Sequence, residues 1–312
     1  MFLKEVYFYK GDENIELNKK RYRDLDTYFK KKFNKKIIKL PLDGGFSCPN
    51  RDGTISTEGC IFCSDSGSGE WTYGKMSIKM QIECQKKRLA KPGRDEAYIG
   101  YFQNFTNTYG PVRKLRALYE AALEDEDLVG LFIATRGDSL SDGVVDLLKE
   151  ISEKTFLVVE LGMQTVNDKT LRLINRGYSH EVFDEGIRKL KDSSIRTLIH
   201  LIVGLPYEND LDYKDSIAYI NSIRPRGIKV HNLYVEKDSR LYNFYKDNDL
   251  AYSMDLETYV DIVVKMLINL DPAIVINRLT GDGIRGNIIF PTWAKNKGKI
   301  LTTIDKNLKK KT

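Results

Sequence analysis

The chain has 312 residues, of which 41% are hydrophobic and 30% charged, and its formal net charge is +6. These proportions exclude a disordered chain and a small disulfide-stabilised domain, because there is enough apolar side chain to bury a sizeable core. No uncharged apolar run is long enough to span a bilayer, and the first residues lack the apolar stretch of a signal peptide. We therefore expect a cytoplasmic protein with reduced thiols and no membrane partner.

Aromatic and basic residues dominate the beginning of the chain. The spacing of Tyr22, Leu25, Tyr28, Phe29 and Phe33 predicts an amphipathic helix over 20–33, with its aromatic stripe packed on the body of the protein. Nine basic and two acidic residues lie between positions 19 and 36, and a second basic run occupies 306–312. Two basic ends suit a polyanion such as RNA, although charge runs are most often solvated surface or a frayed tail.

Apolar, β-rich runs alternate with helical patterns after residue 35. The runs are 36–40, 97–102, 128–135, 156–162, 196–203 and 228–234, and the helical patterns between them are 112–123, 143–151, 168–174, 181–190 and 211–222. This order predicts repeated βα units around a parallel sheet. A helical pattern at 256–270 and a seventh apolar run at 273–278 follow. We expect one domain over 36–285, with basic extensions at 1–35 and 286–312.

Three of the four cysteines lie in one glycine-rich loop after the first predicted strand. Eleven residues separate Cys48 from Cys60 and two separate Cys60 from Cys63. A Cys-x-x-Cys pair lets two thiolates reach one metal centre from a single turn. No fourth ligand is near in sequence, because the histidines are remote and Cys84 lies in a helical pattern. Three alternatives remain open: an iron–sulfur cluster with one open iron, structural zinc, and a redox disulfide.

In a parallel α/β barrel the ligands gather on the loops that follow the strands. Other motif-like segments fall at such places, namely 101–103, 135–138, 160–164 and 204–206. We therefore expect these segments and the cysteine loop to meet at one mouth of the barrel, which the N-terminal and C-terminal extensions cover.

Several of these segments together resemble a known family. Segments 43–54, 101–109, 160–165, 174–177 and 200–206 are similar to radical S-adenosylmethionine (radical SAM) enzymes of the YtqA/YhcC type, which share their radical domain with the catalytic subunit of Elongator. The resemblance extends from about residue 43 to residue 282. It implies an α/β fold, a partial (β/α)6-type TIM barrel of radical SAM enzymes with short N- and C-terminal extensions.

The resemblance also implies roles for individual residues. Cys48, Cys60 and Cys63 hold a [4Fe–4S] cluster whose open iron binds S-adenosylmethionine. The implied cofactor contacts are Phe62 beside adenine, Gln164 and Arg176, with Glu160, Arg136 and Asp138 as either further contacts or structural ion pairs. His200 occupies a position where some relatives bind ribose, or it is a satisfied core histidine. No catalytic residue is assigned.

The sequence departs from the family pattern in three places, two of which are Gly137, where relatives tend to have proline, and His200, where some radical enzymes carry a ribose-binding aspartate. The usual Gly-Gly-Glu motif after the second strand is not evident, and 101–103 stands in its place. The segment 278–282 resembles a family segment and is expected to line the substrate mouth, unless it is a plain Gly-Asp turn.

The implied activity is reductive cleavage of S-adenosylmethionine to a 5′-deoxyadenosyl radical, which requires an electron donor such as flavodoxin or ferredoxin. The YtqA-like resemblance implies tRNA as partner, with carboxymethylaminomethyl-uridine at the wobble position converted to aminomethyl-uridine for a downstream tRNA methylase. The alternatives are a radical enzyme acting on a small molecule and a non-catalytic iron–sulfur or zinc RNA-binding protein.

Overall fold

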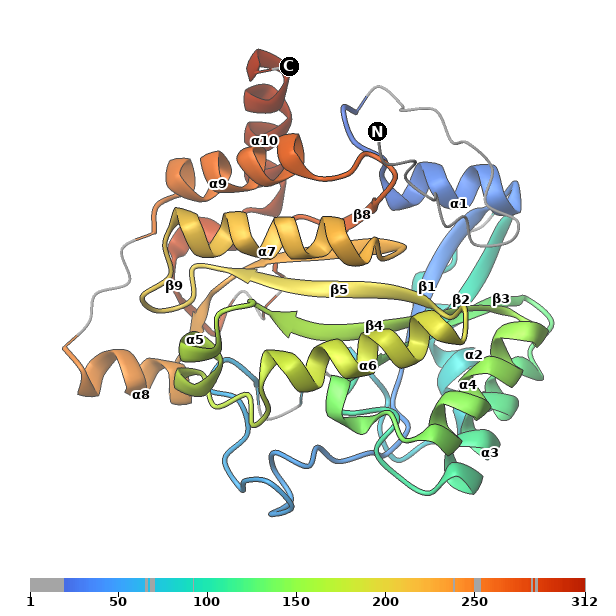
Figure 1. Ribbon diagram of the computed structural model, residues 1–312. Coiled ribbons are helices and arrows are strands. Elements are labelled where there is room, and N and C mark those ends of the chain that lie inside the picture. The colour runs from blue at the N-terminus through green and yellow to red at the C-terminus, as the bar shows by residue number, and fades with distance from the viewer. Residues whose placement is uncertain are drawn as a thin grey trace, which may run out of the picture.

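Seven parallel strands form one open sheet in the computed structural model, which describes residues 20–64, 67, 71–91, 93–237, 239–249, 254–281, 283 and 286–311. The strands are β1 (Lys36–Leu42), β2 (Glu96–Phe102), β3 (Leu128–Thr135), β4 (Phe156–Gln164), β5 (Arg196–Val203), β6 (Gly227–Asn232) and β8 (Val275–Arg278). They follow one another in chain order, with β1 and β8 at the two edges (Figure 1). The predicted partial barrel is confirmed.

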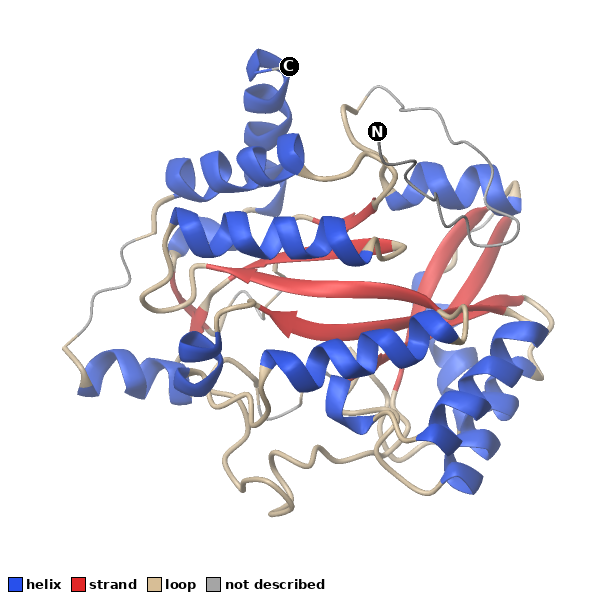
Figure 2. Ribbon diagram, in the orientation of Figure 1, coloured by secondary structure: helices blue, strands red, loops and turns tan. Residues whose placement is uncertain are grey.

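Helices cover the outer face of this sheet (Figure 2). They are α2 (Ile78–Leu89), α3 (Val112–Leu123), α4 (Asp142–Lys154), α5 (Asp168–Leu173), α6 (His180–Asp192), α7 (Asp210–Ile223) and α9 (Leu256–Asn269). The helix α10 (Lys297–Lys311) packs on α9, and α8 (Arg240–Asp247) contacts the short strand at Val235–Glu236. Short 3-10 helices lie at Gly137–Ser139 and Thr292–Lys295, and β7 (Val235–Glu236) pairs antiparallel with β9 (Ile288–Phe290). The predicted helical and strand patterns each match an element, with ends that differ by a few residues.

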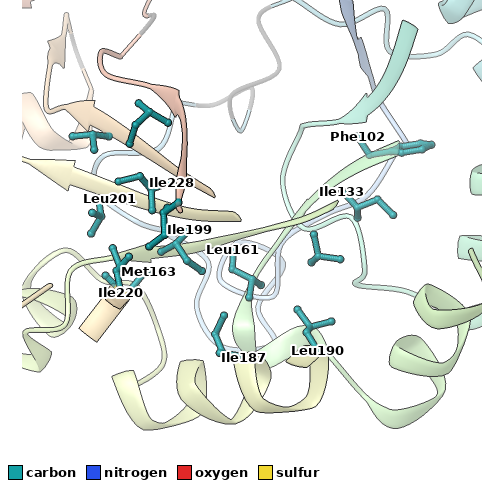
Figure 3. Packing of buried hydrophobic residues seen from close by; sticks show 14 of the residues in the cluster. Phe102, Ile133, Leu161, Met163, Ile187, Leu190, Ile199, Leu201, Ile220 and Ile228 are labelled. Atoms are coloured by element: carbon teal, nitrogen blue, oxygen red, sulfur yellow. The ribbon is translucent and has the colours of Figure 1, made fainter. Parts of the chain in front are cut away.

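Alternate residues along each strand face opposite sides of the sheet. On the outer side, strand and helix residues form the largest apolar cluster, part of which appears in Figure 3. Phe102 and Leu161 from the strands and Leu190 from α6 are fully buried in it. This layer fixes how the strands lie, and with them the loops that follow the strands.

The helix α1 (Leu25–Phe33) fills the inner side of the sheet. Tyr28 and Phe29 are only 2% and 3% exposed and pack against Phe132 and Phe156. The helix begins at residue 25 rather than 20, because the Asp24 side chain caps it by accepting from the Thr27 backbone amide.

The position of α1 corrects one expectation. The strand residues that pack against α1 lie near the beginnings of the strands, such as Ile37 in β1 and Phe156 in β4. The described part of the N-terminal extension therefore closes the barrel at the end opposite the strand carboxyl ends. For residues 20–35 the expectation that the extension covers the mouth bearing the cysteine loop is wrong, and residues 1–19 lie outside the described residues.

The C-terminal basic run belongs to a packed helix. Ile300, Ile304 and Leu308 of α10 are buried, and α10 lies against α9. The helix continues to Lys311, so the basic end is not a frayed tail over the described residues. No helix within the described ranges is long and apolar enough to cross a membrane. The division of the chain at residues 35 and 285 stays a prediction.

Replacement of Phe29 by alanine should lower the free energy of unfolding by about 3–5 kcal/mol, because it removes a buried aromatic ring from the barrel interior. Replacement of the exposed Lys31, in the same helix, by alanine should change it by less than about 0.5 kcal/mol. Urea denaturation followed by circular dichroism measures both. Equal losses in the two variants would contradict the inward packing of α1.

Candidate functional site

A cavity of about 670 Å³ opens where the strands end and continues into the barrel. Nine of the ten predicted site residues line it, namely Cys48, Cys60, Phe62, Cys63, Arg136, Glu160, Gln164, Arg176 and His200. The tenth, Asp138, binds the guanidinium of Arg136 through two hydrogen bonds of 2.9 and 2.7 Å. The fold thus brings together residues that are up to 152 positions apart in the sequence (Cys48 to His200).

The three loop cysteines border this cavity as free thiols, whereas Cys84 lies on α2 and does not line it. Burial, followed by the neighbouring Cys63 and then Cys48, raises the pKa of Cys60 to about 12. A metal centre is therefore needed to keep Cys60 as a thiolate near pH 7.

The cysteines do not form a compact mononuclear site. Over the ranges that the structure describes, no group of three or more His, Cys, Asp or Glu side chains is placed to hold a single metal ion. Structural zinc requires four such ligands in a tight tetrahedron. A four-iron cluster binds each cysteine through a different iron and so accepts sulfur atoms that lie farther apart.

Two asparagines fix the cysteine loop to the turn after α5. The Asn50 amide donates to the backbone oxygen of Asn175 at 2.6 Å and lies 3.6 Å from the sulfur of Cys60. The Asn175 amide donates in turn to the backbone oxygen of Gly59 at 2.8 Å. Gly177 has a φ of +84°, and a Cβ there would lie 2.5 Å from Oδ1 of Asn50, so only glycine fits. The predicted motif 174–177 therefore anchors the loop.

Two arginines donate further hydrogen bonds to backbone oxygens of the cysteine loop, one from within the loop and one from α8. Arg51 Nη2 donates to the backbone oxygens of Cys63 at 3.2 Å and Ser64 at 2.7 Å. Arg240, at the beginning of α8, donates to the backbone oxygen of Cys60 at 2.9 Å. Sequence reasoning missed Asn50, Arg51 and Arg240, because a side chain that binds backbone oxygens leaves no spacing signal.

Arg136 places a cation beside the cysteines. Its Nη1 lies 3.9 Å from the sulfur of Cys48 and donates to the backbone oxygen of Arg176 at 3.0 Å. Burial lowers the pKa of Arg136, but hydrogen bonds and charge from Asp138 outweigh burial and hold it above its usual value. A permanent positive charge there stabilises thiolates and other anions nearby.

Arg176 is 1% exposed, and its guanidinium binds backbone oxygens. It donates to Met163 at 3.0 Å, Tyr178 at 3.2 Å and Ser179 at 2.7 Å. These bonds fix the end of β4, where Gln164 has a φ of +63° in the left-handed region. Such strain is typical of functional positions, yet the cofactor contacts expected of Gln164 and Arg176 stay predictions.

Glu160 is the centre of a buried charged network. Its Oε2 accepts from Lys229 Nζ at 2.5 Å, Tyr101 Oη at 2.7 Å and His200 Nε2 at 2.9 Å, while Lys39 Nζ lies 3.3 Å from Oε1. Although burial raises the pKa of Glu160, Lys229 and then Lys39 lower it well below its usual value. The ion pair is thus present in the structure, and the cofactor contact expected of Glu160 stays a prediction.

The two lysines of this network were not predicted. Lys39 lies between Ile38 and Leu40 in β1, and Lys229 lies between Ile228 and Val230 in β6, so each is a charged residue with apolar neighbours on both sides. A charged residue at such a place indicates a polar side chain that faces the barrel interior. Sequence reasoning did not use this signal. Tyr101, which replaces part of the missing Gly-Gly-Glu motif, contributes its hydroxyl to the same network.

The cavity has a strong excess of positive charge. Its described lining includes seven basic side chains, from Lys39, Arg51, Arg88, Arg136, Arg176, Lys229 and Arg278, and one carboxylate, from Glu160. Arg278 thus lines the cavity as expected for the segment 278–282, while Asp282 lies outside the described residues. The site is suited to anionic ligands.

His200 stacks on His231, with ring centroids 5.6 Å apart.

Comparisons with known proteins agree with this arrangement. The model of the radical SAM superfamily matches residues 52–220, and the model of the radical SAM C-terminal domain matches residues 225–310. YtqA of Bacillus subtilis is 40% identical over 290 residues, covering 93% of this chain and 90% of YtqA.

Two further proteins are similar over smaller shares of their length. The tRNA uridine(34) acetyltransferase of Methanocaldococcus infernus is 27% identical over 162 residues, which are 50% of this chain and 30% of that protein. The solved structure of the archaeal Elp3 of the same organism, with residues 1–46 deleted, superposes with a TM-score of 0.66 at 16% identity. The superposition covers 87% of this chain and 63% of that one, and at this identity it supports the fold alone.

We expect each of three single variants, Cys48→Ala, Cys60→Ala and Cys63→Ala, to lose stable iron binding after anaerobic reconstitution, because the two remaining thiolates do not hold the cluster. Replacement of Cys84 is the matched control and should leave the iron and sulfide content unchanged. Metal analysis and visible absorption measure the result. Full iron retention in a Cys48 variant, or its loss in the Cys84 variant, would show that the ligand set is different.

Proposed function

Because the chain belongs to the radical SAM superfamily, we propose that this enzyme modifies the wobble uridine of tRNA, converting carboxymethylaminomethyl-uridine to aminomethyl-uridine. When bound, the [4Fe–4S] cluster and S-adenosylmethionine would supply a 5′-deoxyadenosyl radical that takes a hydrogen atom from the substrate. With S-adenosylmethionine as the two-electron oxidant and one water consumed, the carboxymethyl group would leave as glyoxylate. Cys48, Cys60 and Cys63 would hold the cluster. An electron donor such as flavodoxin or ferredoxin would reduce it, and a tRNA methylase would act on the product.

The donor set of the cysteine loop fits such a cluster. Three thiols border the cavity, and N–H groups of Asn50 and Arg136 face two of the sulfur atoms. Hydrogen bonds to sulfur tune the reduction potential of iron–sulfur clusters. The protein's own contribution is then to orient substrate and cofactor and to keep water away from the cavity.

The observation that carries the proposal is the positive cavity that contains the three cysteines. Seven basic lining residues against one carboxylate favour a polyanionic substrate over a neutral small molecule. The partial similarity to a protein named for uridine 34 of tRNA supports the same substrate class.

The basic ends of the chain add to this support. A second cavity of about 350 Å³ lies between α1, β8 and α10, and its described lining includes Lys20, Lys36 and Lys297. Lys39 and Arg278 border both cavities. Asp24 and Asp26 also line this second cavity and pair with Lys20 and Lys36, so Lys297, Lys39 and Arg278 are the lining residues through which its positive charge supports an anionic substrate.

The proposal is tested by anaerobic reconstitution with iron and sulfide, followed by an assay for 5′-deoxyadenosine with and without tRNA. Mass analysis of the nucleosides should show aminomethyl-uridine replacing carboxymethylaminomethyl-uridine, and tRNA lacking that modification is the control. Deoxyadenosine formed equally in both cases, with no change in tRNA, would contradict the proposal and favour a small-molecule substrate. Salt-sensitive tRNA binding with no deoxyadenosine would favour the non-catalytic alternative.

A further inference from the structure

Lys39 occupies the inner end of the main cavity, where the two edge strands of the sheet face the same space. It lies on β1, while Asn277 and Arg278 come from β8 and its end, and these three residues line both cavities. About 21% of the Lys39 side chain remains accessible, in contrast to 0% for Glu160. Its ammonium group lies 3.6 Å from the centroid of the Phe132 ring. Lys39 is therefore held in place and still reachable from the cavity.

Lys39 shares its carboxylate partner with a second lysine. Glu160 is the one carboxylate within ion-pair distance of Lys39 among the described residues, at 3.3 Å. That carboxylate already accepts a shorter bond from Lys229, at 2.5 Å, and two more from Tyr101 and His200. One negative charge thus serves two lysines, and Arg278 adds a further positive charge to the same wall.

A second observation at this end also favours a ligand. The Nε2 atom of His231 is buried and has no hydrogen-bond partner among the described residues, although the residue lines the main cavity. A buried polar atom without a partner is costly, and a bound ligand satisfies it. Burial keeps the pKa of His231 well below its usual value, so its ring is neutral near pH 7.

We propose that Lys39, Asn277 and Arg278 form a subsite that binds the carboxylate of the substrate. This inference rests on the proposed function, in which the substrate uridine carries a carboxymethyl group. A guanidinium fork can bond a carboxylate through two parallel hydrogen bonds, and an ammonium group adds a positive charge beside it. The subsite lies toward the interior end of the cavity, and Arg136 and the cysteines lie at its mouth, so the carboxylate and the cofactor occupy different ends.

Lys39 also gives the subsite a pH dependence. Burial, opposed by Glu160 and assisted by Lys229, lowers the pKa of Lys39 to about 7. The groups that face it are Glu160, Tyr101, Lys229, Arg278, His200 and His231. The pKa of Glu160 is lowered, those of both histidines are lowered, and that of Tyr101 is raised. Lys39 carries its positive charge below its pKa, so carboxylate binding should weaken as the pH rises from 7 to 9.

The test uses the reconstituted protein with S-adenosylmethionine and no reductant, so that binding is measured without turnover. Isothermal titration compares 5-carboxymethylaminomethyl-uridine with its methyl ester, which differs by the single negative charge. The wild-type protein should bind the acid at least about tenfold more tightly than the ester. Lys39→Gln should remove this preference for the acid. Lys39→Arg should keep the preference and should show no decline in it between pH 7 and 9, because arginine stays charged over that range.

Lys149→Gln is the matched control, because Lys149 is exposed on α4, and its preference should equal that of the wild type. Circular dichroism and iron content verify that each variant is folded, and the Lys39→Arg pH profile decides the question if Lys39→Gln does not fold. Equal binding of acid and ester by the wild type, or an unchanged preference in Lys39→Gln, overturns the subsite. A Lys39-dependent preference without any tRNA modification supports the subsite and contradicts the proposed reaction instead.

Discussion

The convergence of three cysteine sulfurs on one cavity is the constraint on which the rest of the structure depends. A loop of this length keeps three thiols together only if its backbone is tied down, since each free residue costs conformational entropy. Asn50, Asn175, Arg51 and Arg240 provide those ties through hydrogen bonds to backbone oxygens. The turn after α5 and the beginning of α8 therefore belong to the site, even though neither supplies a metal ligand.

The barrel interior is organised in layers along the strands. Phe29 and its aromatic neighbours fill the end where the strands begin, the Glu160 network occupies the middle, and the cysteine loop lies where the strands end. Glu160, at the centre of the charged layer, is 1% exposed, so charges there interact strongly. A radical reaction benefits from the same dry interior, because water and stray hydrogen donors are kept away.

The sequence predicted the repeating units and the residues at the strand ends, because hydrophobic periodicity and strand-end motifs are local signals. Gly177 and Arg176 were noticed as a motif, but their contacts with backbone oxygens depend on the folded chain. Lys39 and Lys229 lie 190 residues apart and share one carboxylate, which no local pattern indicates. The place of α1 was likewise decided by tertiary packing, since an aromatic stripe fits either end of a barrel.

The central claim is that three cysteines leave one iron of the cluster open for S-adenosylmethionine. Electron paramagnetic resonance of the reduced, reconstituted protein tests it most directly, because the spectrum of a cluster responds to a ligand at its open iron. The account predicts a changed spectrum on addition of S-adenosylmethionine, and no change with S-adenosylmethionine in a Cys60→Ala protein, which holds no cluster. A wild-type spectrum that is identical with and without S-adenosylmethionine would contradict the claim.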